Sequence, residues 1–396
     1  MGFNFLKKEK ENLFWVLDIG NEAVKTLIIE RDGNRIAVLG VGMRYFDSYG
    51  SSGGSDSAET ILKKAISKSI EEALQRFSIA SKNKVENQWK KWPVFIGLPP
   101  DMLKARISRY YYERAKPEEK ISKSEEVIIC RKCLESIKNE ISNEFAKDAG
   151  ILVDDIHWVG FEISKKIIDG YAPGNIIGVN GRKLEFNVLA IFMGEYYYKN
   201  IERILASIGL RILRMIHISE NFFSLPISEK SNSALFDIGG DVVQLFLTRN
   251  GFLEKINEFK LGGRIFTEKL SDVLGISEES ARILKEKYSN NTLNSKSAER
   301  VKEIFSHDKS YWKRDLELGL KKIGCNSHSF DDIFIFGGAG SMPEVREVFS
   351  SMVGDPFCEA KIIYPKSISG FDDYTKILDS SQYAPCLMIA NSILKN

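Results

Sequence analysis

The sequence predicts an α/β protein built from two related halves, and three observations lead to this prediction. First, one apolar run ends in Asp18-Ile-Gly20, and a second ends in Asp237-Ile-Gly-Gly240. Second, each is followed by an alternating strand and a hairpin signal, at Asp32-Gly33 and at Asn250-Gly251. Third, the first half reads as a β-meander, a helix and a buried strand, an order typical of an α/β layer. The repeat indicates a duplicated fold that holds a ligand between its halves.

The first half begins with the elements of this layer. Apolar and alternating patterns predict, in order, strands at 13–17, 25–30 and 35–41, a Gly/Ser-rich loop at 47–57, an amphipathic helix at 58–77 and a strand at 94–98. The three strands at the start form an antiparallel meander. The two prolines at 99 and 100 end the last strand, because proline cannot donate to a ladder.

Residues 99–182 read as a small α+β module inserted into the first half. Ser122 and Glu125 have the spacing of a capping box and open a helix that we expect to reach about residue 147. Strands are predicted around it at 106–113, 156–163, 166–168 and 183–192. A helix at 199–208 and a strand at 211–218 return the chain to the first domain.

The second half repeats the strand–turn–strand unit from Ser233 onward. The patterns that follow predict a strand at 253–259, helices at 264–273 and 278–288, a polar loop at 289–300, helices within 301–323, a strand at 332–336 and a last helix at 385–394.

The glycines in these turns suggest a ligand. Glycines let backbone N–H groups approach a phosphate closely, and the acid before them can hold a metal-bound water. Gly262-Gly263 stand at the head of a helix, where a phosphate can meet the helix N-terminus. Gly337-Gly-Ala-Gly340 join a strand to a helix and allow a base or sugar to pack against backbone. Each motif also has a purely structural interpretation. The Asp-Ile-Gly runs can be ordinary hairpins with a turn aspartate, and the two later glycine groups can be tight strand-to-helix turns.

Composition excludes several classes of protein. The net charge of +2 on 396 residues gives no electrostatic case for nucleic acid. No apolar run reaches the roughly 18 residues of a membrane span, and the lysine-rich start lacks the apolar stretch of a signal peptide. Five scattered cysteines are typical of a reducing cytosol, and the pair Cys130 and Cys133 lies inside a helical pattern without a second ligand pair.

The ordered motifs resemble the phosphate-1, phosphate-2 and adenosine motifs of the actin-like ATPase superfamily. Within it the chain is most similar to the FtsA/PilM group, which contains the bacterial cell-division protein FtsA and the pilus component PilM. The stretch from Lys260 to Lys285 is similar to the family segment that follows phosphate-2. Asp169-Gly170 and Gly178 to Glu185 resemble the end of the inserted module of FtsA.

The resemblance implies two RNase-H-like lobes, of the actin and Hsp70 type, with an FtsA-type 1C α+β module in place of actin subdomain 1B. Subdomain 1A would comprise 1–98, 183–218 and 380–396, and the inserted subdomain 1C would comprise 99–182. Subdomain 2A would comprise 219–262 and 329–379, and subdomain 2B would comprise 263–328.

The resemblance also implies a site for ATP or ADP with Mg²⁺. Asp18 and Asp237 would be the catalytic acids and would orient Mg²⁺ through its waters. The residues implied to contact the nucleotide are Gly20, Asn21 and Lys25 on one side of the phosphates, Gly239, Gly240 and Gly262 on the other, Gly263 and Lys285 by the ribose, and Gly337, Gly338 and Gly340 by the adenine. Such a site works mainly by positioning and charge neutralisation.

Departures from the family pattern predict slow or absent ATP hydrolysis. The family usually has a third glycine, threonines and an acid after phosphate-2, where this chain has Asp241, two valines and Gln244. Small hydroxyl residues are usual after the phosphate-1 glycine, where this chain has Asn21 and Glu22. A carboxylate near polyphosphate is unfavourable unless it points away or meets the metal.

Three functions remain open. The first is a cytoskeletal scaffold at the cytoplasmic face of the inner membrane, which polymerises with itself and links division proteins, such as the tail of tubulin-like FtsZ, to the membrane. The second is a PilM-like cytoplasmic adaptor that binds a peptide of a pilus inner-membrane protein. The third is a sugar-kinase-like enzyme. Membrane contact would be indirect or through the segment containing Phe3, Phe5, Leu6, Lys7 and Lys8.

Overall fold

The structure is a computed structural model that describes residues 12–46, 57–81, 88–228, 231–325, 330–352 and 360–395. The chain divides into two compact units. The first, which we call lobe 1, comprises Met1–Leu98, Glu202–Leu225 and Tyr364–Asn396. The second contains an inserted module, Pro99–Ile201, and lobe 2, Pro226–Ile363. Each unit is described by itself below.

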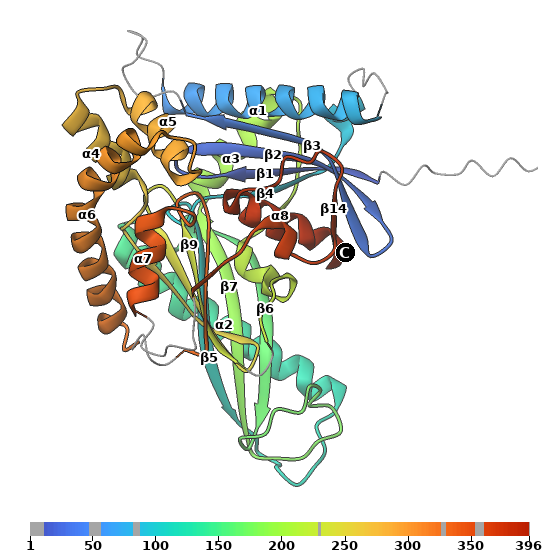
Figure 1. Cartoon of the computed structure of the whole chain (residues 1–396). Helices are drawn as coiled ribbons and strands as arrows, with labels where there is room; N and C mark the ends of the chain where they lie inside the picture. The colour runs from blue at the N-terminus through green and yellow to red at the C-terminus, as the bar shows by residue number, and fades with distance from the viewer. Residues whose placement is uncertain are drawn as a thin grey trace, which may run out of the picture. The chain divides into compact units, whose positions relative to one another are not determined.

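Lobe 1 is built on a sheet with the strand order β14-β3-β2-β1-β4-β8 (Figure 1). Its strands are β1 Leu13–Ile19, β2 Ala23–Asp32, β3 Arg35–Tyr45, β4 Val94–Gly97, β8 Ile212–Met215 and β14 Phe371–Asp373. β1, β2 and β3 form the predicted antiparallel meander, and β4 and β8 continue the sheet in parallel. Helices α1 (Ala58–Ser81) and α8 (Ala384–Asn391) cover opposite faces, which is why β1, β2 and β4 are buried almost throughout.

Helix α1 lies unusually close to β3 because two strand residues are glycines. A Cβ on Gly42 would stand 1.8 Å from the carbonyl oxygen of Ser69, and one on Gly40 would stand 2.6 Å from that of Ala73. On the same face the hydroxyls of Thr26 and Ser69 lie 2.6 Å apart and form a buried hydrogen bond. The glycines therefore set the distance between helix and sheet.

Replacing Gly42 by alanine is expected to lower the free energy of unfolding by about 1–3 kcal/mol, because α1 must move away from the sheet. Urea unfolding measures this change. Gly160→Ala is the control, since a Cβ on Gly160 meets nothing within 4 Å. Equal stability of the two variants would contradict the close packing described here.

Lobe 2 repeats the plan of lobe 1. Its sheet has the order β11-β10-β9-β12-β13, with an antiparallel meander followed by parallel strands. The strands are β9 Asn232–Ile238, β10 Val243–Arg249, β11 Phe252–Phe259, β12 Asp332–Phe336 and β13 Ala360–Ile362. The helices are α4 Arg264–Leu274, α5 Glu278–Ser289, α6 Ser295–Lys322 and α7 Pro343–Met352, and they share one core with β9, β10 and β12. The predicted duplication is therefore confirmed.

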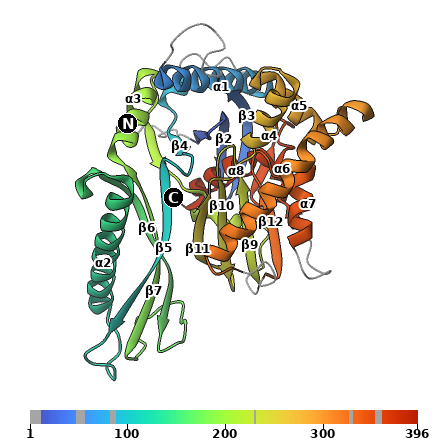
Figure 2. The ribbon, with the colours of Figure 1, turned by 90° about the vertical axis from the view of Figure 1, so that its left-hand side faces the viewer.

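The inserted module is a sheet of long strands backed by one helix (Figure 2). β5 (Leu103–Glu113) and β6 (Ile156–Ile168) both pair antiparallel with β7 (Lys183–Gly194), and α2 (Lys123–Ala149) packs on the sheet. Ser122 caps α2 as predicted, and the side chain of Cys133 is in the module core. Helix α3 (Glu195–Ser207) follows β7.

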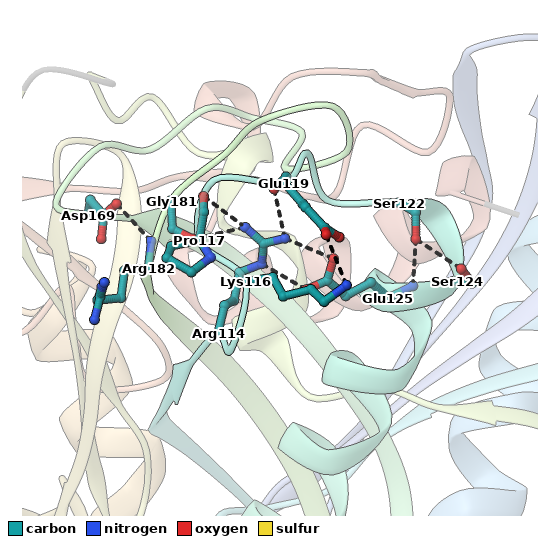
Figure 3. Close-up of polar contacts among 10 residues, drawn as sticks. All are labelled: Arg114, Lys116, Pro117, Glu119, Ser122, Ser124, Glu125, Asp169, Gly181 and Arg182. Carbon is teal, nitrogen blue, oxygen red and sulfur yellow. Dashed lines mark hydrogen bonds and ion pairs between the residues drawn. The ribbon is translucent and has the colours of Figure 1, made fainter.

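At one end of this module a buried arginine ties several loops together (Figure 3). The Arg114 side chain is 1% exposed and forms a bidentate ion pair with Glu125, at 2.8 and 2.9 Å. It also donates to the carbonyls of Gly181 and Glu119, each at 2.9 Å. Nearby, the carboxylate of Asp169 accepts from the backbone N–H groups of residues 182 and 183. One side chain thus ties two loop segments to the first turn of α2.

The structure corrects several predicted boundaries. Residues 183–194 form the central strand of the module sheet, so the predicted boundary after residue 182 cuts that sheet. The stretch 364–379 was expected in lobe 2, but β14 pairs with β3 of lobe 1, and Arg35 forms an ion pair with Asp372. The strand predicted in two pieces at 156–168 is continuous, and one of its two register shifts, between Ile163 and Lys165, lies at the predicted interruption.

The polar stretch 289–300 is also different from the prediction. Asn294 caps α6 by accepting from the backbone N–H of Ser297, so one helix runs from Ser295 to Lys322. The segment containing Phe3, Phe5, Leu6, Lys7 and Lys8 and the loop at 47–56 lie outside the described residues. Among the residues that are described, no helix has both the length and the apolar content needed to cross a membrane.

Candidate functional site

The first predicted turn is the hairpin between β1 and β2. Asp18 lies in the buried part of β1, one residue before its end, and pairs in register with Lys25. The Gly20 N–H donates to the Ala23 carbonyl at 2.9 Å. The Lys25 ammonium lies 2.9 Å from the Asp18 carboxylate, and each side chain is only 12% exposed. Asn21 and Glu22 occupy the turn and are half-buried. The sequence-predicted residues of lobe 1 are therefore brought together in one turn.

The hairpin between β9 and β10 has the same geometry. Asp237 pairs in register with Gln244, seven positions later, as Asp18 does with Lys25. Gly239 N–H donates to the Val242 carbonyl at 3.0 Å. Gln244 therefore takes the strand position in lobe 2 that a lysine takes in lobe 1. Its side chain amide points to the Glu258 carboxylate, at 3.5 Å.

Glu258 in turn connects the β10–β11 hairpin to the inserted module. The Lys104 ammonium of β5 lies 2.6 Å from the Glu258 carboxylate, and Arg109 lies 3.9 Å from Glu254, also on β11. These partly exposed ion pairs hold the module against an acidic strand edge, in the same unit as the Asp237 turn. The sequence patterns did not predict this contact.

The second glycine pair packs against the Asp237 turn. Gly263 N–H donates to the Gly239 carbonyl at 2.9 Å, and Arg264 N–H donates to the Gly240 carbonyl at 2.8 Å. A Cβ on Gly262 would stand 1.8 Å from the Gly240 oxygen. Only glycine allows this approach, so the two loops form one backbone surface.

The third glycine group closes the same surface. Gly337 has φ +90°, and a Cβ there would stand 2.2 Å from the Asp237 carboxylate oxygen Oδ1. Gly340 also has little room, since a Cβ there would stand 2.8 Å from the Phe336 carbonyl oxygen. A Cβ on Gly338, by contrast, would meet nothing within 4 Å. Lys285 from α5 donates to the Gly263 carbonyl at 3.0 Å. All the sequence-predicted residues of lobe 2 therefore lie around one glycine-lined surface.

Helices α5 and α7 are also linked behind this surface. The Tyr288 hydroxyl donates to Glu344 Oε1 at 2.7 Å, and Glu344 is 3% exposed. Burial raises the pKa of the Glu344 carboxyl and also that of the Tyr288 hydroxyl. Sequence reasoning missed this pair, because a glutamate in the first turn of a helix is ordinarily exposed.

The geometry fits a nucleotide on two grounds. Gly262 packs directly on the Gly240 carbonyl, and a Cβ on Gly239 would meet only the Val242 carbonyl, so this turn presents backbone without side chains, as a phosphate cradle requires. The Asp18 and Asp237 carboxylates each lie directly before such a turn, where a hydrated Mg²⁺ would be held. The prediction that the two turns face one nucleotide stays a prediction.

Comparisons with known proteins agree with these motifs. The family model for cell division protein FtsA matches residues 234–387. The FtsA proteins of two Staphylococcus epidermidis strains are each 23% identical over 376 residues, covering 87% of this chain and 74% of the relative. A chain from a PilM–PilN type IV pilus biogenesis complex superposes with a TM-score of 0.64 at 14% identity, covering 97% of this chain and 99% of the other.

The chain is thus similar in sequence to FtsA proteins and shares its fold with a chain of a pilus complex. The resemblance predicted from the motifs is therefore confirmed, and so is the actin-like fold with its duplicated lobes. Within the group, sequence similarity points to FtsA, whereas the superposed structure comes from a pilus complex.

Proposed function

We propose that this FtsA-like protein binds ATP or ADP with Mg²⁺ and acts as a scaffold in bacterial cell division, with slow or absent hydrolysis. The observation that carries the proposal is the register-matched pair of hairpins, each with an acid before a glycine turn. Lys25 would neutralise phosphate charge in lobe 1, and the backbone N–H group of Gly240 would donate to a phosphate in lobe 2.

The slow turnover follows from the residues around the second turn. Hydrolysis requires a group that orients or deprotonates the attacking water, and the family usually has an acid at the position of Gln244. The Gln244 side chain amide instead points to Glu258, at 3.5 Å, and although an amide can orient a water, it cannot accept its proton near neutral pH. Binding is thereby separated from turnover, which suits a scaffold that changes partner affinity with its bound nucleotide.

The scaffold role is supported by the similarity to FtsA over most of the chain. In this role the protein would associate with itself, through the inserted module and the small part of lobe 2 at 263–328, and would link division proteins to the cytoplasmic face of the inner membrane. A tubulin-like FtsZ tail is the expected division partner. Membrane contact would be indirect or through the N-terminal segment.

A second candidate is a PilM-like adaptor, because the pilus-complex chain superposes over 97% of this chain. The adaptor would bind a short peptide from a pilus inner-membrane protein and would not need to form filaments or hydrolyse ATP. Both candidates use the same nucleotide site, so they differ in partner and not in chemistry.

Sedimentation of the full chain with vesicles of phosphatidylglycerol and phosphatidylethanolamine, with and without Mg-ATP, tests the scaffold role. We expect ATP-dependent filaments when lipid is present. The parallel experiment is a pull-down with a peptide from the cytoplasmic tail of a pilus inner-membrane protein. Peptide capture without filaments would replace the division role by the adaptor role, and failure of both would contradict the two proposals together.

A further inference from the structure

An ion pair stands beside the lobe 2 turn that neither the motifs nor the proposed nucleotide contacts include. The Arg264 Nε lies 3.2 Å from the Asp241 carboxylate, and the two side chains are 37% and 40% exposed. Asp241 directly follows Gly239-Gly240, and Arg264 directly follows Gly262-Gly263. Each charge is thus one residue away from backbone that lines the glycine surface.

The backbone holds this ion pair in place. The Arg264 N–H donates to the Gly240 carbonyl at 2.8 Å, so the two residues are joined through their main chains as well as their side chains. Gly263 is the N-cap of α4 and has no side chain to contribute, so Arg264 is the first residue of the helix. The backbone positions from which the Asp241 and Arg264 side chains extend are therefore joined at the turn.

The two lobes differ in where the positive charge comes from. In lobe 1 it comes from the strand after the turn, where Lys25 faces Asp18 at 2.9 Å. In lobe 2 the corresponding strand position holds the uncharged Gln244. Arg264 brings a positive charge to the lobe 2 turn from another element, and Asp241 opposes it.

These charges act differently on nucleoside diphosphates and triphosphates. A triphosphate has more negative charge than a diphosphate, so an acid beside the turn repels it more, and a cation attracts it more. Because both side chains are more than a third exposed, water and salt weaken the effect without removing it.

We propose that Asp241 and Arg264 are the residues that set the preference of this site between nucleoside diphosphate and triphosphate. Asp241 weakens triphosphate binding, and Arg264 restores it by neutralising that carboxylate. This proposal rests on the proposed nucleotide binding and deepens it.

Isothermal titration of the full chain with Mg-ADP and with Mg-ATP tests the assignment. We expect Asp241→Asn to lower the dissociation constant for ATP by about threefold to tenfold, with a smaller change for ADP. Arg264→Gln should raise the dissociation constant for ATP by a similar factor, and the double variant should lie between the two. All of these changes should shrink as salt is raised.

The control is the exposed ion pair of Arg300 and Glu303 on α6, which has a similar separation of 3.1 Å. Arg300→Gln and Glu303→Gln should leave both affinities unchanged. If both nucleotides bind but neither Asp241→Asn nor Arg264→Gln changes the ratio of the two affinities by more than about twofold, the assignment is wrong. If the unaltered chain binds neither nucleotide, the proposed function fails and this inference fails with it.

Discussion

Replacing Gly337 by alanine is expected to lower the free energy of unfolding of lobe 2 by about 2–5 kcal/mol and to abolish nucleotide binding. Two costs add at this residue. Its φ of +90° is unfavourable for any residue with a Cβ, and the new methyl group would stand 2.2 Å from the Asp237 carboxylate oxygen. The acid proposed to hold Mg²⁺ would be pushed away from its turn.

Alanine substitutions at two other glycines separate the cost of backbone strain from the cost of the steric clash. Gly275 has φ +64° with nothing within 4 Å of a Cβ, so Gly275→Ala measures backbone strain alone. Gly338 lacks both a positive φ and a near neighbour, so Gly338→Ala should leave stability within about 1 kcal/mol of the unaltered chain. Urea unfolding of the three variants gives the comparison. A Gly337→Ala variant no less stable than Gly275→Ala would show that Asp237 does not lie against this backbone.

The second large effect is expected at Arg114 in the inserted module. Arg114→Leu should lower the free energy of unfolding of the module by about 2–4 kcal/mol, because it leaves Glu125 and two carbonyls without their donor. The loops that meet at this side chain would lose their common anchor (Figure 3). Urea unfolding measures the loss of stability. In a separate experiment, the exchange of amide hydrogens in residues 114–125 measures the loosening of the loops.

A matched control is Arg106→Leu, which removes an exposed ion pair with Glu144 in the same module. Exposed pairs contribute about 0–1 kcal/mol, so this variant should be nearly as stable as the unaltered chain. Similar losses at Arg106 and Arg114 would contradict the anchoring role.

The Arg114 pair also predicts a pH dependence. The hydrogen bond from Arg114 lowers the pKa of the Glu125 carboxyl from its ordinary value of 4.5. The stabilisation by this pair is therefore present above about pH 4.5 and is lost as the pH falls through the lower folded-state pKa. The stability difference between the unaltered chain and Arg114→Leu should narrow in that acid range.

Much of the fold could be predicted because local sequence patterns indicate its strands, helices and turns. The two Asp-Ile-Gly runs, their strands and their hairpin signals are contiguous in sequence, and the structure gives both the same register. The strand of 183–194 was assigned to the wrong domain because its pattern says only that it is buried. Which sheet buries it depends on its pairing with β6 and with β5, and β5 is distant in sequence.

In the candidate site, too, local motifs could be predicted, whereas contacts between distant segments could not. Glycine motifs predicted which residues gather in each lobe, since a close backbone approach demands glycine. The pair of Asp241 and Arg264 was not predicted as an interaction, although each residue directly follows a glycine motif. Pairs of charges twenty or more residues apart carry no periodic signal, and their meeting follows from the packing of two loops.

Equilibrium binding of Mg-ADP to the full chain and to variants of each turn tests the central claim most directly. Gly20→Ala and Gly239→Ala suit this purpose, since their methyl groups would meet only a carbonyl oxygen, at 3.4 and 3.1 Å. The account predicts that the unaltered chain binds a single nucleotide and that either substitution weakens binding at least about tenfold. Absence of saturable binding at millimolar nucleotide, or full affinity after either substitution, would contradict it.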